Sequence, residues 1–310
     1  MTLYLTEEDV DSLLGPADAL AAVEDSFRRL ARGTVDNRPR QRLKLEEGLL
    51  AVMPAADLEL GYAGLKTYAA FGYGNVRFVV LLFETQRANL AAVIEANRLG
   101  QLRTGAASGV AARHLARSGA RTLGVIGCGF QAETQVACVR EALPELERVV
   151  AYCRTPERLE RFCAAVGAEP AESHREAGEQ DVVVTATTSK DPVLRGEWLR
   201  PGALVCAVGA NDRSARELDN AVLERAAFVC CDSREQARLE SGDLIEPIER
   251  GVLDWLEVHE LQEVVAGELT GRQSDDDIVL FKSNGIAAWD IALGAAALER
   301  ARERGLGREL

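Results

Sequence analysis

Three positively charged side chains occupy positions that an ordinary surface charge explains poorly. Lys66 interrupts an apolar segment flanked by glycines, where it faces either solvent or a cleft. Arg103 opens a predicted helix of small residues, although cations are unfavourable at helix N-termini. A bound carboxylate would resolve that conflict, because it accepts hydrogen bonds from arginine and from free backbone N–H groups. With Arg40 as a third candidate, these residues predict a site for an anionic group; the alternative for each is a solvated charge.

A glycine-rich turn follows the strand predicted at residues 122–126. Residues 127–132 read G-C-G-F-Q-A, a G-x-G-x-x-A pattern that precedes a predicted helix. Gly127 permits the tight turn, Gly129 lets the backbone approach a pyrophosphate, and Ala132 is small enough for helix–strand packing. The pyrophosphate would lie at the positive helix N-terminus. This strand–turn–helix arrangement predicts a dinucleotide site; the alternative is a glycine turn without a ligand.

The end of the next predicted strand indicates the type of dinucleotide. NAD-specific sites usually place Asp or Glu there, about 20 residues past the glycines. This strand instead ends in Arg154 and Thr155, with Arg158 one turn into the following helix. Arginine binds a 2′-phosphate through two parallel hydrogen bonds, and a threonine hydroxyl adds another. The residues favour NADP(H), while NAD(H) stays possible because Arg154 can be solvated and Thr155 can serve as a helix cap.

Two patterns of apolar residues predict the elements that position these groups. The first third mixes short helices and strands: helices at 7–14, 16–32 and 101–118, and strands at 40–45, 49–53, 65–70 and 76–83. The continuous apolar run 79–83 predicts a fully buried strand. From residue 121, strands at 122–126, 148–153, 181–186, 203–208, 227–231 and 277–281 alternate with helices at 131–141, 156–166 and 217–225. A last helix is predicted at 286–304.

The alternating part predicts an α/β fold with a Rossmann-type, doubly wound parallel sheet covered on both faces. We assign residues 115–285 to this dinucleotide-binding domain. It is inserted in a second, α+β domain made of residues 1–114 and 286–310.

The composition excludes several classes of protein. The 310 residues are 47% apolar and 27% charged, and they contain no apolar run long enough for a membrane span. A net charge of −13 makes nucleic acid an unfavourable partner. The acidic N-terminus lacks a secretory signal, which predicts a cytoplasmic protein. Seven cysteines without a C-x-x-C pair and three scattered histidines predict buried thiols and no metal site.

Taken together, these motifs resemble those of the ornithine cyclodeaminase/mu-crystallin family over essentially the whole chain. The segments that carry the resemblance are 39–40, 52–55, 64–66, 102–107, the glycine turn, 186–189, 198–203, 217–219, 242–244 and 280–285. The family includes cyclodeaminases, alanine dehydrogenases and ketimine or other imine reductases. The resemblance implies a homodimer whose split N- and C-terminal domain forms the dimer interface and binds a small amino- or imino-acid substrate.

The resemblance also implies roles for individual residues. Arg40, Lys66 and Arg103 would hold the substrate carboxylate or polarise the reacting centre, with Lys66 also counted as catalytic. The expected cofactor contacts are Thr104, Gly127, Gly129, Phe130, Gln131, Ala132, Arg154, Thr155, Arg158, Thr187, Thr188, Ser189, Val208, Gly209 and Ser283.

One position departs from the family pattern. Cyclodeaminases and family alanine dehydrogenases carry a catalytic Asp where this chain has Asn211, followed by Asp212. An amide cannot exchange protons near neutral pH as a carboxylate does. We therefore count Asn211 and Asp212 as catalytic candidates, with a simple turn residue as the alternative for Asn211.

Three functions follow in order of preference. The first is an NAD(P)H-dependent reductase of an imino acid, a ketimine or cyclic imine carboxylate, or the reverse amino-acid dehydrogenase. The second is an ornithine cyclodeaminase with tightly bound NAD. The third is a non-catalytic, NADP-dependent protein that binds a small ligand.

Overall fold

The computed structural model describes residues 2–71 and 76–310. It divides into two compact units, Met1–Arg103 with Ile286–Leu310, and Thr104–Gly285. The chain passes from the first unit to the second within helix α3 (Asn97–Leu115). Within the described ranges, no helix is long and apolar enough to cross a membrane.

The first unit is built on a mostly antiparallel sheet. Its strands are β1 (Leu3–Leu5), β2 (Val35–Asn37), β3 (Gln41–Leu45), β4 (Gly48–Asp57), β5 (Tyr62–Ala70), β6 (Arg77–Glu84), β7 (Leu90–Glu95) and β16 (Arg308–Glu309). They lie in the order β16-β1-β7-β6-β5-β4-β2, and β3 also pairs with β4. β1 runs parallel to β7, and the other pairs are antiparallel.

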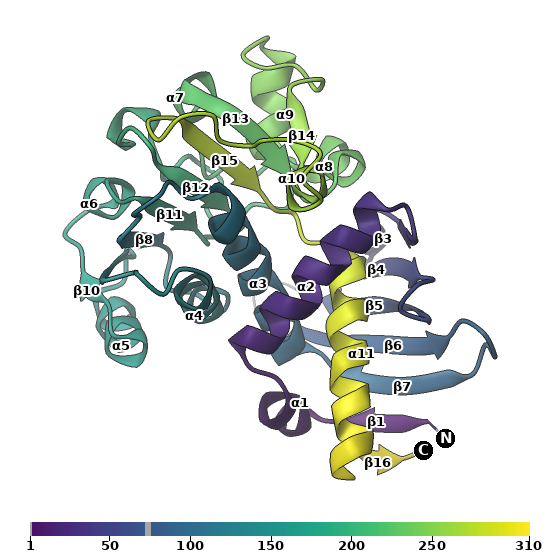
Figure 1. The fold of residues 1–310 in the computed structure, drawn as a ribbon. Coiled ribbons are helices and arrows are strands. Elements are labelled where there is room, and N and C mark those ends of the chain that lie inside the picture. The colour runs from purple at the N-terminus through teal and green to yellow at the C-terminus, as the bar shows by residue number, and fades with distance from the viewer. Residues whose placement is uncertain (1, 72–75) are drawn as a thin grey trace. The chain divides into compact units, whose positions relative to one another are not determined.

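Helices α1 (Glu7–Leu13), α2 (Pro16–Ala31) and α11 (Ala287–Arg304) complete this unit. Helix α11 lies across β4, β5 and β6 and packs against α2 (Figure 1). Its Ala-rich sequence permits this close approach, and a Cβ at Gly64 of β5 would already meet the Ile291 side chain at 3.0 Å. The last helix of the chain therefore reaches strands that are more than 200 residues away in sequence.

Strand β6 corrects the prediction of a fully buried strand at 79–83. Val80 and Leu82 are fully buried, whereas Val79, Leu81 and Phe83 are only half-buried. The reason is that β6 is an antiparallel strand with α11 against one face, so alternate side chains point away from the helix. The neighbouring strand β7 was not predicted from the sequence.

The second unit contains a sheet of eight parallel strands (Figure 1). They are β8 (Thr122–Ile126), β9 (Arg148–Tyr152), β10 (Glu169–Pro170), β11 (Val182–Thr185), β12 (Leu204–Ala207), β13 (Ala226–Cys231), β14 (Val258–Glu260) and β15 (Ile278–Lys282). Their order is β10-β9-β8-β11-β12-β15-β13-β14. The first five strands therefore follow the 3-2-1-4-5 order of a Rossmann fold, with the switch point between β8 and β11. This confirms the predicted fold class.

The helices of this unit connect successive parallel strands. They are α4 (Ala132–Ala142), α5 (Pro156–Val166), α6 (His174–Gly178), α7 (Asn220–Arg225), α8 (Arg234–Glu240), α9 (Gly242–Glu249) and α10 (Leu261–Val265), with a 3₁₀ turn at Gly196–Trp198. All residues of β11, β12 and β15 are buried, as expected for strands covered on both faces.

Helix α7 is shorter than the helix predicted at 217–225. The Asp219 carboxylate accepts a hydrogen bond from the Val222 N–H and so caps the helix, which begins at Asn220. Glu217 lies outside the helix because its carboxylate and backbone are bound elsewhere, as described below.

Candidate functional site

The glycine turn after β8 has the conformation that a dinucleotide requires. Gly127 adopts φ +106°, and a Cβ there would lie 2.5 Å from the Ala186 carbonyl oxygen, so no side chain fits. At Gly129 the nearest atom to a Cβ would be 4.0 Å away, so this glycine leaves open space above the turn. Helix α4 follows, and its N-cap residue Gln131 makes no side-chain capping bond. The turn therefore presents backbone to a ligand at a helix N-terminus.

A cavity of about 360 Å³ lies over this turn and brings together much of the predicted cofactor set. The predicted residues that line it are Gly127, Gly129, Arg154, Thr155, Arg158, Thr187, Thr188 and Ser189. These residues come from the carboxyl ends of β8, β9 and β11, which flank the switch point of the sheet. Dinucleotides bind at this place in open parallel sheets. The residues present thus fit a nicotinamide dinucleotide.

Three side chains with basic groups line the cavity. Arg154 and Arg158 line it together with His174, which was not predicted from the sequence. The His174 ring packs edge-on against Tyr152 at the end of β9, with ring centroids 4.5 Å apart. Burial, and then the charge of Arg154, lowers the pKa of His174. Thr155 is the N-cap of α5, but its hydroxyl makes no capping bond, so helix capping does not account for this side chain.

The remaining predicted cofactor residues are not part of the cavity lining. They are Thr104, Phe130, Gln131, Ala132, Val208, Gly209 and Ser283. The Ser283 hydroxyl donates to the buried Asp232 carboxylate at 2.9 Å, which also accepts the N–H groups of Asn284 and Gly285. In this structure Ser283 therefore anchors the segment that follows β15.

A buried carboxylate holds the loops at the ends of β11 and β12. Glu217 accepts the Thr187 N–H at 2.7 Å, the Gly209 N–H at 2.7 Å and the Thr185 hydroxyl at 3.0 Å. The Ala210 N–H also donates to it at 3.2 Å. Burial raises the pKa of Glu217. A cavity-lining loop and the loop that leads to residue 211 are thus fixed by one side chain.

Lys282 and Asp243 complete this buried network. The Lys282 ammonium is fully buried, donates to the Ala210 carbonyl at 2.6 Å and lies 3.1 Å from the Asp243 carboxylate. Asp243 in turn accepts the backbone N–H groups of Glu217 and Leu218 at 2.7 and 3.0 Å. The single ammonium of Lys282 compensates for two buried carboxylates, Asp243 and Glu217, because its charge also favours the ionised form of Glu217.

Asn211 and Asp212 follow this anchored segment and are exposed within their unit. The Asp212 carboxylate accepts the Ser214 N–H at 2.9 Å and the Ser214 hydroxyl at 2.6 Å, which forms a local turn. The amide at 211 and the carboxylate at 212 therefore occupy one exposed loop at the carboxyl end of β12.

The three predicted cations come together in the first unit. Arg40, Lys66 and Arg103 are 8%, 2% and 7% exposed, so none is a surface charge. Lys66 on β5 pairs across the sheet with Met53 on β4, whose sulfur accepts a hydrogen bond from the Arg40 Nε at 3.2 Å. The Lys66 ammonium also lies 5.7 Å from the centre of the Phe78 ring.

A buried carboxylate that was not predicted joins this cluster. Asp290, on α11, lies 2.9 Å from the Lys66 Nζ and accepts a hydrogen bond from the Arg103 Nε at 3.2 Å. Burial, and then the charge of Arg103, lowers the pKa of Lys66 to about 7, while Asp290 acts in the opposite direction. Lys66 and Arg103 share this one carboxylate, and the Arg103 Nη1 is buried without a hydrogen-bond partner among the described residues.

The prediction that Arg103 opens a helix is wrong, although Arg103 does belong to the buried cluster. Helix α3 begins at Asn97, so Arg103 lies in its second turn and not at its N-terminus. The N–H groups of Asn97 and Arg98 donate to the Glu7 carboxylate at 2.6 and 2.8 Å. The end of the helix is thus already capped, and the carboxylate that contacts Arg103 is Asp290.

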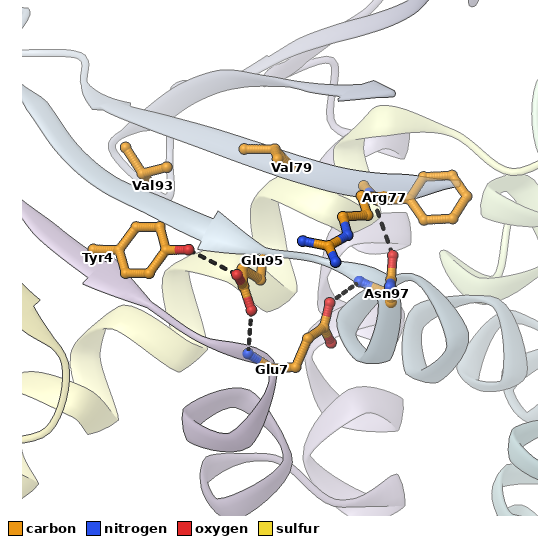
Figure 2. Close-up of a pocket in the computed structure, with 8 residues that line it drawn as sticks. Tyr4, Glu7, Arg77, Val79, Val93, Glu95 and Asn97 are labelled. Atoms are coloured by element: carbon orange, nitrogen blue, oxygen red, sulfur yellow. Dashed lines mark hydrogen bonds between the residues drawn. The ribbon is translucent and has the colours of Figure 1, made fainter. Parts of the chain in front are cut away.

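A second cavity in the first unit, about 420 Å³, surrounds this capped helix end (Figure 2). Figure 2 shows Glu95 within reach of Tyr4, whose hydroxyl donates to it at 2.7 Å, while the Glu7 N–H donates at 3.0 Å. These bonds hold the pKa of Glu95 below its ordinary value. The Glu7 and Glu95 carboxylates in this cavity join β1 and α1 to β7 and α3, so we assign the cavity no substrate.

Some of the missed residues had a sequence signal. Asp290 is the single acidic residue in the Ala-rich apolar stretch 286–298, a pattern that indicates a buried carboxylate with a partner. Glu217, Asp243 and Lys282 stand in segments already singled out, but nothing local predicts that they meet. His174 carries no distinguishing pattern.

Known proteins match both units. The sequence model of the ornithine cyclodeaminase/mu-crystallin family matches residues 1–305. The structure is similar to that of Thermococcus litoralis Δ1-pyrroline-2-carboxylate reductase in complex with NADH and L-proline, at 33% identity and a TM-score of 0.94 over 99% of this chain and 100% of that one. An archaeal alanine dehydrogenase dimer with bound NAD is 35% identical, with a TM-score of 0.93 over 100% of this chain and 98% of that one. Iminosuccinate reductase of Paracoccus denitrificans is 30% identical over 99% of both chains. This chain belongs to the ornithine cyclodeaminase/mu-crystallin family.

Proposed function

We propose that this protein is an NAD(P)H-dependent reductase of an imino acid, or acts in reverse as an amino-acid dehydrogenase. Relatives with a pyrroline carboxylate, an iminosuccinate and an alanine substrate share one chemical feature, a C=N or CH–NH bond next to a carboxylate. The dinucleotide supplies or accepts the hydride when it is bound. The chain's own residues then have to hold the carboxylate and handle one proton.

The observation that carries this proposal is the buried surplus of positive charge in the first unit. Lys66 and Arg103 contribute two buried basic groups, and both share a single carboxylate, Asp290. Buried charges are costly unless they are paired. A substrate carboxylate would supply the missing negative charge and an acceptor for the unpartnered Arg103 Nη1.

Lys66 is the candidate for proton transfer. A general acid is most effective when its pKa lies near the working pH, and the pKa of Lys66 is lowered to about 7. In its protonated form Lys66 can donate to the imine nitrogen during reduction. In its neutral form it can accept the proton of an amine during oxidation.

Arg154 and Arg158 in the dinucleotide cavity support a preference for NADP(H). Both arginines line the cavity, and no carboxylate ends strand β9 at the place where NAD-specific sites have one. A 2′-phosphate would interact with the two guanidinium groups and with the Thr155 hydroxyl.

Replacing Arg154 by alanine is expected to weaken NADPH binding selectively. Loss of one charge-assisted contact to phosphate should cost about 1.5–3 kcal/mol, or roughly 10- to 150-fold in Kd. NADH lacks the 2′-phosphate, so its Kd should stay close to that of the wild type. Fluorescence titrations with both cofactors measure the two values. Arg161→Ala, an exposed arginine on the same helix outside the cavity, is the matched control; equal losses for NADPH and NADH would show that Arg154 does not contact the 2′-phosphate.

We further propose that the first unit, with the substrate cations, also carries a homodimer interface. On the face of β5, β6 and β7 that points away from α11, Leu65, Val79, Leu81 and Val93 are apolar and only half-buried in one chain, beside the polar Thr67 and Glu95. An apolar sheet face of this kind is typical of a surface that another chain covers. The second unit, built around the switch point, would bind the dinucleotide.

The wild-type protein is expected to reduce preformed imine carboxylates and not to convert ornithine to proline. Reduction needs one hydride and one proton, whereas cyclodeamination relies on an acid/base carboxylate where this chain has Asn211. A spectrophotometric panel of five- and six-membered cyclic imine carboxylates, and of keto acids with amines, tests reduction with NADPH and NADH. Ornithine is assayed in parallel for ammonia and proline.

Asn211→Asp and Asp212→Asn distinguish the outcomes of this panel. Efficient formation of proline by the wild type would contradict the role given to Asn211, and its loss in Asp212→Asn would identify the carboxylate responsible. Ligand binding without turnover in any assay would instead indicate the non-catalytic binding protein.

A further inference from the structure

Asp290 stands at a point where two like charges would otherwise repel each other. It is the fourth residue of α11 and is completely buried. Its Oδ1 accepts a hydrogen bond from the Lys66 Nζ at 3.1 Å and from the Arg103 Nε at 3.2 Å, while its Oδ2 lies 2.9 Å from the Lys66 Nζ. One oxygen therefore binds both basic groups and fixes the distance between them.

The surroundings of Lys66 make this carboxylate necessary. The elements packed around its side chain contribute two further charged groups, Arg103 from α3 and Arg40 from the segment before β3, and both lower the pKa of Lys66. Its neighbours on β4 and β6, Met53 and Phe78, carry no charge. Asp290 is thus the group that opposes burial and two guanidinium charges together.

We infer that Asp290 is a positioning residue for the reaction, which holds Lys66 and Arg103 side by side and keeps the Lys66 amine able to carry a proton. The inference rests on the proposed function, because it assigns Lys66 the proton and Arg103 the substrate carboxylate. We assign Asp290 neither the proton transfer nor a contact with the substrate carboxylate, because its oxygens face the two basic side chains. The residue that controls the protonation of Lys66 on β5 therefore lies on α11, the last helix of the chain.

Two kinetic consequences separate this role from a general contribution to folding. Without the carboxylate, Lys66 is neutral at neutral pH, so kcat for reduction falls, and it recovers as the pH is lowered because Lys66 is protonated again. Arg103 also loses the bond that orients it, so KM for the imine carboxylate rises at every pH. A loss of folded protein alone would lower activity equally at all pH values and would leave KM unchanged.

The direct test is a titration of Lys66 by NMR in the free protein. The chain contains four lysines, Lys44, Lys66, Lys190 and Lys282, so ¹³C-labelled lysine gives few signals, and Lys66→Met assigns the one that matters. In Asp290→Asn the midpoint of Lys66 should fall by about 1–3 pH units, as expected for the loss of an adjacent opposite charge. Asp290→Glu, which keeps the charge, should restore much of the midpoint. An unchanged midpoint in Asp290→Asn overturns the inference.

Asp57→Asn is the matched control for loss of a buried carboxylate in the same unit. Asp57 is also completely buried and pairs with Arg29 at 2.7 Å, on β4 and away from Lys66. This variant should be less stable but should keep the Lys66 midpoint and the pH profile of kcat. If Asp290→Asn does not fold, Asp290→Ser, which leaves room for a water, provides the same measurement.

The titration and the kinetics also separate this inference from the proposed function. A lowered Lys66 midpoint in Asp290→Asn, with a wild type that reduces no imine, would support the effect of Asp290 on Lys66 and contradict the reductase. A lowered midpoint with no change in the pH profile of kcat would contradict the role of Asp290 in the reaction.

Discussion

Replacing Lys66 by methionine should lower kcat for imine reduction by about 10²- to 10⁴-fold, the range usually lost with a general acid. Methionine keeps most of the buried aliphatic volume and removes the proton donor together with its ion pair to Asp290. In the wild type, the reduction rate should fall as the pH rises through about 7, because Lys66 loses its proton there. Oxidation of the amine should show the opposite dependence, and the variant should lose both.

Cofactor binding provides the first control for this result. Lys66 belongs to the first unit and the dinucleotide cavity to the second, so the Kd of NADPH should stay close to the wild-type value. Lys44→Met, an exposed lysine on β3, is the matched variant and should retain full activity. If Lys66→Met keeps its activity and its pH profile, the proton is delivered by another group and the assignment of Lys66 is wrong.

Replacing Lys282 by methionine should destabilise the protein by about 3–5 kcal/mol, the usual cost of removing one partner of a buried ion pair. Asp243 and Glu217 would both lose the ammonium that compensates for their burial. Urea unfolding followed by circular dichroism measures the difference from the wild type. Because the loops that line the cavity depend on Glu217, the affinity for NADPH should fall as well.

The pH dependence of this deficit identifies its cause. Burial already raises the pKa of Glu217, and loss of Lys282 should raise it further. A carboxyl group whose folded pKa is raised contributes stability at low pH, and loses it as the pH rises through that pKa. The deficit of Lys282→Met should therefore shrink at acidic pH. Arg213→Met, which breaks the exposed pair with Glu249, should cost no more than about 1 kcal/mol; a similar loss for Lys282→Met would contradict the network.

Features that depend on neighbouring residues were readable from the sequence. The glycine turn is one, because a strand, two glycines and a helix in succession determine a local conformation, and Gly127 does adopt positive φ. The parallel sheet is another, since continuous apolar strands alternating with helices leave few other arrangements. The burial of β6 was not readable, because an apolar run does not tell which face of a strand a helix covers.

Arg103 shows how a suspected residue can have the wrong explanation. The sequence pattern starts the helix near Arg103, where a positive charge is unfavourable, but helix ends are set by capping groups, and Glu7 supplies one from about 90 residues away. Ser283 also has a partner that is distant in sequence: its hydroxyl donates to Asp232, which follows β13 and lies 51 residues earlier.

By itself the sequence determined the central strands of the parallel sheet, the dinucleotide turn and the identity of three unusual cations. Only the tertiary structure decided that those cations form one cluster, and that Asp290 lies between two of them. Asp290 is 224 residues from Lys66 and 187 from Arg103, so no local pattern relates them. The contact exists because α11 returns to pack on β5, and there burial makes the charge of each group depend on the others.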